Sequence, residues 1–164
     1  MTLTRIYIPL TAAGLRSLDA ERAVAGAPFV AHAVTDAVRA SSPSAGQDGW
    51  EYSALSDAAL RSAVLLTIGE RHRIVAAADV APEIVAAASP GDALDSGDFI
   101  DDSAVLILDS VALNRIASFH VDSDGASEDD ELLWYDVTEL PVILASIGPA
   151  VKKRGRASTH SPSR

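Results

Sequence analysis

The residues best suited to chemistry are a histidine and an aspartate two positions apart. His120 and Asp122 lie in residues 115–122, where apolar and polar residues alternate as is typical of a strand. Residues two apart share one face of a strand, and imidazole and carboxylate groups both bind divalent metals. Further ligands would have to come from other strands, and His32 and Asp136 are the candidates. The competing interpretation, which we favour, is a half-exposed strand face whose histidine meets water or a carboxylate, because two ligands do not define a metal site.

Ser118 precedes this pair and raises the question of a serine nucleophile. Three residues in a row along one extended strand cannot easily converge on one reacting atom, and the sequence has no Gly-x-Ser-x-Gly turn. Glycine-rich phosphate-binding patterns are also missing from the sequence. We therefore predict no cofactor, and a divalent metal on the His120 face is the alternative.

A second candidate site consists of aromatic and acidic residues. Glu51 and Tyr52 form one pair, and Trp134 and Tyr135 form another, in a sequence with only 5% aromatic residues. Such polar-tipped side chains can form a binding surface. They can equally fill the space between an alanine-rich helix and a sheet, which ordinary burial tendencies favour.

Charge is distributed unevenly along the chain. Residues 1–151 carry eight arginines against 23 acidic residues, whereas the last stretch carries basic residues and no acid. The body would repel nucleic acid and anionic membranes. Nucleic acid could bind only through the basic tail, whose relevant residues are Lys152, Lys153, Arg154 and Arg156.

The sequence contains no cysteine, which excludes disulfides, thiolate zinc sites and iron–sulfur clusters. The first residues lack the basic and apolar regions of a secretory signal, and no window approaches the roughly 20 apolar residues of a membrane span. We expect a cytoplasmic protein that does not bind membranes.

Hydrophobic periodicity predicts a single α+β domain over residues 1–150 and a disordered basic tail over residues 151–164. Strands are predicted at residues 5–10, 29–34, 73–80, 104–111, 115–122 and 132–136. Helices are predicted at residues 35–39, 53–68 and 83–88, and two more are predicted to begin with Thr11 and Thr138 as their N-caps. Loops are predicted at residues 41–49 and 89–102. The 53–68 helix is predicted to bury a face that includes Leu55, Leu60 and Val64.

These elements have the order βαβααβαβββα. They predict a mixed, largely antiparallel sheet of five to six strands with helices mainly on one face.

Six segments carry a resemblance to a known family. They are Arg-Ile-Tyr-Ile-Pro-Leu at 5–10, Ala-His-Ala-Val-Thr at 31–35, Glu-Tyr-Ser-Ala-Leu at 51–55, Ala-Ala-Asp-Val at 77–80, Phe-His-Val-Asp at 119–122 and Leu-Leu-Trp-Tyr at 132–135. Their order and spacing resemble an uncharacterised family of short actinobacterial proteins, described only as a domain of unknown function. The resemblance spans most of residues 4–140 and implies no activity and no catalytic residue.

Three functions remain open. The leading hypothesis is a non-catalytic binding or regulatory module that contacts another protein through a sheet face or an acidic surface. The alternative is a metal-dependent, hydrolase-like enzyme centred on His120 and Asp122. The third is nucleic-acid association through the tail. The partner and the oligomeric state cannot be derived from the sequence.

Overall fold

The first strand defines two faces of a sheet. In the computed structural model, which describes residues 2–89 and 100–148, β1 (Thr4–Leu10) lies at the centre of a seven-stranded sheet of order β5-β6-β3-β1-β4-β8-β9. Each neighbouring pair of these strands is antiparallel. The remaining strands of this sheet are β3 (Phe29–Ala33), β4 (Ile74–Val80), β5 (Val85–Ala87), β6 (Ala104–Ile107), β8 (Ile116–Val121) and β9 (Leu133–Asp136).

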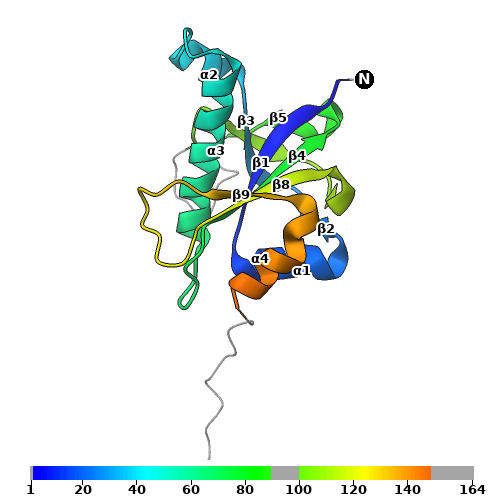
Figure 1. Ribbon diagram of the computed structural model, residues 1–164. Helices are drawn as coiled ribbons and strands as arrows, with labels where there is room; N and C mark the ends of the chain where they lie inside the picture. The colour runs from blue at the N-terminus through cyan, green and yellow to red at the C-terminus, as the bar shows by residue number, and fades with distance from the viewer. Residues whose placement is uncertain (1, 90–99, 149–164) are drawn as a thin grey trace, which may run out of the picture.

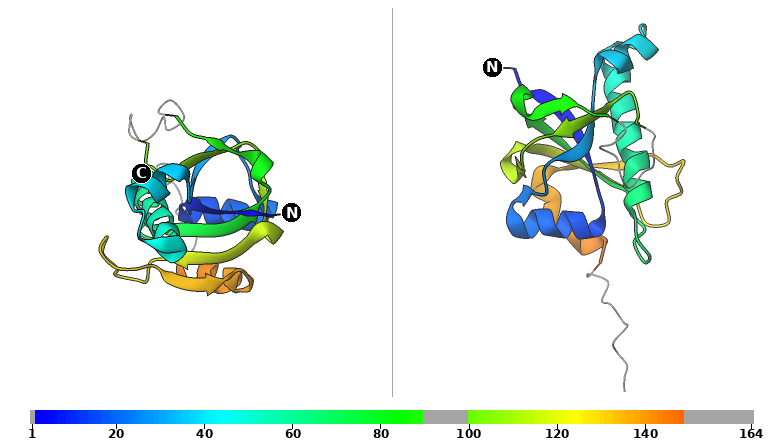
Figure 2. Two further views of the ribbon diagram at one scale, coloured as in Figure 1. Left: turned by 90° about the horizontal axis from the view of Figure 1, so that it is seen from above. Right: turned by 180° about the vertical axis from the view of Figure 1, so that it is seen from behind.

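The helices divide between the two faces of this sheet. On one face lie α1 (Ala12–Glu21) and α4 (Leu140–Ser146), together with a small second sheet of β2 (Ala23–Val24) and β7 (Val111–Ala112). The long helix α3 (Gly46–Leu65), preceded by α2 (Asp36–Ser41), covers the other face. Figures 1 and 2 show α3 along one side of the strands and α1 beside α4 at one end. Short 3-10 turns occur at Pro82–Ile84, Leu113–Arg115 and Val137–Glu139.

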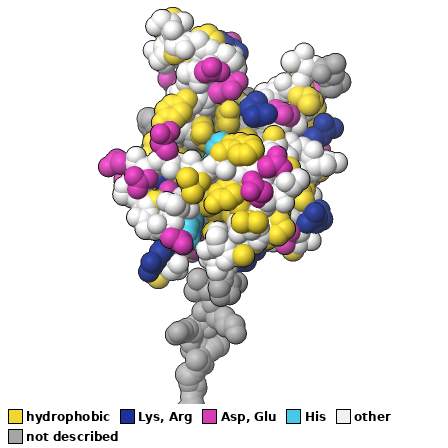
Figure 3. Space-filling view, in the orientation of Figure 1, with side chains coloured by type: hydrophobic (Ala, Val, Ile, Leu, Met, Phe, Trp, Pro, Cys, Tyr) yellow, Lys and Arg dark blue, Asp and Glu magenta, His cyan; other side chains and the backbone are white. Residues whose placement is uncertain are grey.

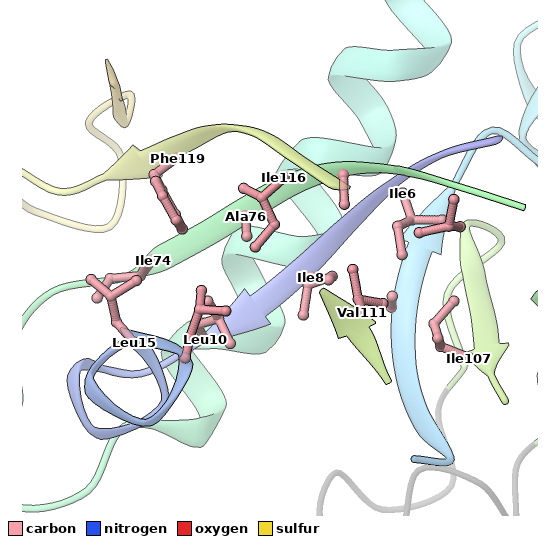
Figure 4. Close-up of a cluster of buried hydrophobic side chains, with 14 of the residues drawn as sticks. Ile6, Ile8, Leu10, Leu15, Ile74, Ala76, Ile107, Val111, Ile116 and Phe119 are labelled. Carbon is pink, nitrogen blue, oxygen red and sulfur yellow. The ribbon is translucent and has the colours of Figure 1, made fainter. Parts of the chain in front are cut away.

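The larger core lies on the α1 and α4 face. Alternate residues of β1 and β4 point into it, and Phe119 of β8 is its largest fully buried side chain. Figure 4 shows Phe119 with Ile74 and Leu15 among the side chains of this cluster. Burying a side chain of this size contributes about 1.5–3 kcal/mol, so this larger cluster should stabilise the fold more than the smaller second core does.

The second core, under α3, consists mainly of small residues. Ala54, Ala58 and Ala59 pack against the sheet. Because alanine side chains are short, the helix axis can lie close to the strands. Ser62 continues this stripe, and its hydroxyl is fully buried, donating to the Leu10 carbonyl at 2.6 Å and accepting from the Ile74 N–H at 3.0 Å.

The predicted buried face of this helix is only partly right. Leu60 is 58% exposed and Val64 is also exposed, but Leu55 of the predicted face packs against the alanine stripe that meets the sheet. The helical periodicity identified an apolar face of large residues. The small residues are buried instead, because only short side chains fit where the helix lies close to the sheet.

The α+β class and the largely antiparallel sheet are confirmed, with seven strands in the sheet. Four local predictions are wrong. Helix α3 begins at Gly46, inside the predicted 41–49 loop, and residues 85–87 form an edge strand rather than a helix. The alternation of residues 115–122 predicts Ile116 on the same face as Ser118 and His120, but a β-bulge at Ala117 turns Ile116 into the core with Phe119. The predicted strand over residues 104–111 divides into β6 and β7.

Two predictions concern residues outside the described part of the chain. These are the disordered basic tail at 151–164 and most of the 89–102 loop. Among the described residues, no helix has the length and apolar character required to cross a membrane.

Candidate functional site

The four predicted metal ligands do not converge. His32 pairs with Tyr7, Tyr7 with Ala77, Ala77 with Ser118, and Ser118 with Asp136, so these residues form one row across five strands. Four strand spacings separate His32 from Asp136, about 19 Å at roughly 4.8 Å per strand. One ion cannot bind both side chains.

His120 lies in a different environment from Asp122. The His120 ring is half-buried in β8, with Nε2 3.4 Å from the Ser118 hydroxyl. Burial, together with the nearby positive charge of Arg5, lowers the pKa of His120 below its ordinary value. The lowered pKa favours the neutral imidazole, and the hydrogen-bond neighbour of its Nε2 among the described residues is the Ser118 hydroxyl.

Asp122 forms a buried ion pair with Arg73. The two carboxylate oxygens accept hydrogen bonds from Arg73 Nη2 at 2.7 Å and Nε at 2.9 Å, and one of them also accepts from the Arg73 backbone N–H at 2.9 Å. The guanidinium also donates to the carbonyls of Ser127, Glu128 and Asp130. Asp122 therefore anchors residues 123–131, which we call the acidic loop, instead of sharing an ion with His120.

Asp136 is a helix cap. Its Oδ2 accepts from the Thr138 N–H at 2.9 Å, and Glu139 Oε2 accepts from the Asp136 N–H at 2.8 Å, which completes a capping box. Hydrogen bonds from Thr138 lower the pKa of the Asp136 carboxyl. The prediction that Thr138 caps this last helical segment is therefore wrong, because the turn begins two residues earlier.

His32 lies at one end of a buried polar chain. Its Nδ1 is 2.9 Å from the Ser103 hydroxyl, which donates to Asp57 Oδ2 at 2.7 Å. His32 and Ser103 are fully buried, and Nε2 of His32 has no hydrogen-bond partner among the described residues. Burial, reinforced by the positive charge of Arg61, lowers the pKa of His32 to about 3.

The sequence interpretation included His32 but missed Asp57. A signal was present, because Asp57 and Arg61 are the only charged residues between positions 53 and 68 and stand four apart, on one side of the helix. Asp57 also borders the alanine stripe that packs on the sheet. A carboxylate beside a buried helix face indicates a polar partner on the sheet.

The aromatic candidates divide between surface and core. Tyr52 is 57% exposed and Trp134 is 61% exposed, so the favoured core interpretation is wrong for both. Tyr135 packs against the larger core, as that interpretation predicted. Glu51 is half-buried, and its Oε2 accepts from Gln47 Nε2 at 2.6 Å.

A groove lies between α3 and the acidic loop. Its cavity of about 250 Å³ is lined on the helix side by Tyr52, Leu55, Ser56, Ala59 and Leu60, and on the other side by Arg73 and residues 128–132. We call these residues the α3 groove. The helix residues recur at the spacing of one helical face, and residues 128–131 are all acidic. Figure 3 shows hydrophobic side chains gathered over α3 and β9, with acidic side chains beside them over the acidic loop.

The comparison with family models identifies the chain's relatives. The sequence model of a family of unknown function, DUF6912, matches residues 4–144. The chain belongs to this family. The DUF6912 match begins at the first residue of β1 and ends within α4, so it includes both the His32 chain and the α3 groove. No curated protein and no solved structure matches the chain.

Proposed function

We propose that this DUF6912 protein is a binding module that holds a segment of another protein in the α3 groove. The observation that carries the proposal is the orientation of α3. This helix packs its alanine stripe on the sheet and leaves Tyr52 and Leu60 of the groove exposed to solvent, with Val64 exposed outside the groove. Single exposed apolar residues are ordinary, but a cluster of them rimmed by polar groups is typical of an interaction site.

The charge of the groove supports a partner segment that is both basic and apolar. One wall of the α3 groove carries four consecutive acidic residues at 128–131, beside apolar side chains of the helix. A segment with apolar side chains for the floor and Lys or Arg side chains for the rim complements both features. A second copy of this chain would bring a like-charged surface to the same place, which disfavours self-association there.

The groove wall is held in place before any partner arrives. Arg73 joins the end of the sheet to the acidic loop through Asp122 and three loop carbonyls. A wall that is already ordered reduces the entropy lost on binding. Such an arrangement suits a binding site more than an exposed loop with no role.

The experiment begins with peptide-display selection against the full chain. We expect the selected peptides to combine large apolar residues with Lys or Arg, and their affinity, measured by fluorescence polarisation, to fall as salt rises. The variant Leu60→Asp should weaken binding at least tenfold, because it places a charge on the apolar floor.

Val142→Asp is the matched control. Val142 is 57% exposed, close to the 58% of Leu60, but it lies on α4 and does not line the α3 groove. This variant should bind the peptides as the unaltered chain does. Peptides without basic residues, or binding that survives Leu60→Asp, would contradict the proposal.

A further inference from the structure

We propose that the partner segment binds as an extended strand that adds to the outer edge of β9. This inference rests on the proposed function, because it specifies how the same basic and apolar segment is held. β9 is the last strand of the seven-stranded sheet. One of its edges pairs with β8, and the other, which we call the outer edge, pairs with no strand of the described residues. Leu132 lines the α3 groove and directly precedes β9, so the groove reaches the start of this strand.

The backbone groups of Trp134 point to the outer edge. The Asp122 N–H donates to the Arg73 carbonyl at 3.1 Å, which turns the backbone groups of Asp122 towards the β4 side. Backbone groups alternate in direction along an antiparallel strand, so those of Val121 face β9, where the paired residue is Leu133. Trp134 is the next residue along β9. Its N–H and C=O therefore point away from β8.

The capping box at the end of β9 agrees with this direction. The Asp136 N–H donates to Glu139 Oε2 at 2.8 Å, on the side away from β8. Groups two residues apart in a strand point the same way, so the N–H of Trp134 shares this side. An N–H and a C=O on one residue can form the pair of hydrogen bonds that joins two antiparallel strands. Trp134 therefore supplies the donor and the acceptor that an added strand needs.

The side chains of this edge are apolar and exposed on both faces of the sheet. Trp134 is 61% exposed and Leu133 is 47% exposed, and successive side chains of a strand point to opposite faces. Sheet edges that avoid pairing usually carry lysine, proline or a bulge. Residues 133–135 contain none of these. An edge of this kind suits strand addition, in which main-chain hydrogen bonds provide affinity and alternate side chains provide specificity.

Acidic residues lie at both ends of β9. Residues 128–131 precede the strand, and Asp136 and Glu139 lie at its other end. A strand with apolar residues in its middle and Lys or Arg at its ends complements this pattern. A second copy of the chain, paired antiparallel through its own β9, would bring acidic residues 128–131 close to the acidic end of the first copy. Like charges opposite each other destabilise a strand pair, so a basic segment of another protein is the better occupant.

An N-methyl scan of a peptide tests this pairing on the unaltered full chain. The probe is the tightest-binding peptide from the display selection, methylated on one backbone nitrogen at a time. Each methyl group removes one backbone donor and keeps every side chain. In an added strand every second N–H faces β9, so methylation at these positions should weaken binding about tenfold or more, and methylation at the positions between them about twofold or less.

Hydrogen exchange and a pair of variants test the protein side of the same contact. The N–H of Trp134 should exchange about tenfold more slowly, or slower still, when the peptide saturates the chain. Trp134→Pro removes this N–H, and proline is tolerated in an edge strand where the N–H faces outwards. Trp134→Val is the matched control, because it removes the same indole and keeps the N–H. The proline variant should bind the peptide about tenfold more weakly than the valine variant, with circular dichroism checking that both are folded.

The scan and the Leu60→Asp variant report on different surfaces. The strand-addition proposal is overturned if no N-methyl position matters, if methylation weakens binding at every position as expected for a bound helix, or if the Trp134 N–H stays unprotected. Equal binding by the folded proline and valine variants would also overturn it. A peptide that depends on Leu60 without any of these β9 effects would keep the proposed function and remove only this inference. An alternating scan from a peptide that ignores Leu60→Asp would place the peptide on β9 and contradict the groove.

Discussion

The ion pair between Arg73 and Asp122 should be a major contributor to stability, and Asp122→Asn is the perturbation that tests this. The two side chains are 8% and 6% exposed, and they meet through two hydrogen bonds. The substitution removes the negative charge but keeps the shape, so the buried guanidinium loses the carboxylate that it binds and keeps only the longer-range charges of Glu128 and Asp130. Removing one partner of a buried pair costs about 3–5 kcal/mol.

The structure contains a matched control for this experiment. Arg5 and Asp79 also meet through two hydrogen bonds, at 2.7 and 2.9 Å, but their side chains are 38% and 36% exposed. Solvent screens such a pair, and it contributes only about 0–1 kcal/mol. Asp79→Asn is the same chemical change with a similar contact geometry, so the difference between the two variants measures the effect of burial.

Urea unfolding of the full chain at pH 7 gives both free energies, and equal slopes against denaturant concentration show that the variants can be compared. Hydrogen exchange provides a second measurement. The amides of the acidic loop should exchange faster in Asp122→Asn and not in Asp79→Asn. The reasoning is refuted if Asp122→Asn costs no more than Asp79→Asn, or if the acidic loop keeps its protection.

Three further predictions concern the sheet and its cores. The lowered pKa of His120 means that the unfolded chain binds more protons than the folded chain below about pH 6.5, so stability should fall as the pH drops through this window. His120→Gln should show a shallower fall between pH 7.5 and 5 in urea unfolding, and an unchanged slope would reject this contribution. Ser62→Ala leaves the buried N–H of Ile74 without its hydroxyl acceptor and should cost about 1–3 kcal/mol in the same assay, whereas no measurable cost would show that the hydrogen bonds are dispensable. Phe119→Ala opens a cavity at a fully buried position and should cost about 3–5 kcal/mol in thermal or urea unfolding, against about 0.5 kcal/mol or less for Val142→Ala at the surface.

Elements defined by local signals could be predicted from the sequence. The alternation of residues 5–10 predicted β1, and Thr11 was correctly identified as the cap of α1, where its hydroxyl accepts from the Gly14 N–H at 3.0 Å. These signals depend on a few neighbouring residues, so one sequence contains them completely. The edge strand at 85–87 could not be predicted in this way. It has only three residues and follows the turn that begins at Pro82, so it is too short to show a periodic pattern.

The orientation of α3 and the partners of His32 could not be predicted, for a different reason. Leu60 and Ala58 are both apolar, and only the distance between helix and sheet decides which one is buried. His32 was identified as a candidate ligand, but its expected partner Asp136 lies four strands away. Strand order is a property of the whole fold, and periodicity within one strand does not determine it.

The most direct test of the central claim is an amide NMR titration of the isotope-labelled full chain with a selected basic, apolar peptide. The account predicts that the shifted signals belong to the α3 groove, with Leu60, Leu132 and the acidic residues 128–131 among them. Shifts confined to α4 or to β5, or no shifts at peptide concentrations that saturate the polarisation assay, would contradict it.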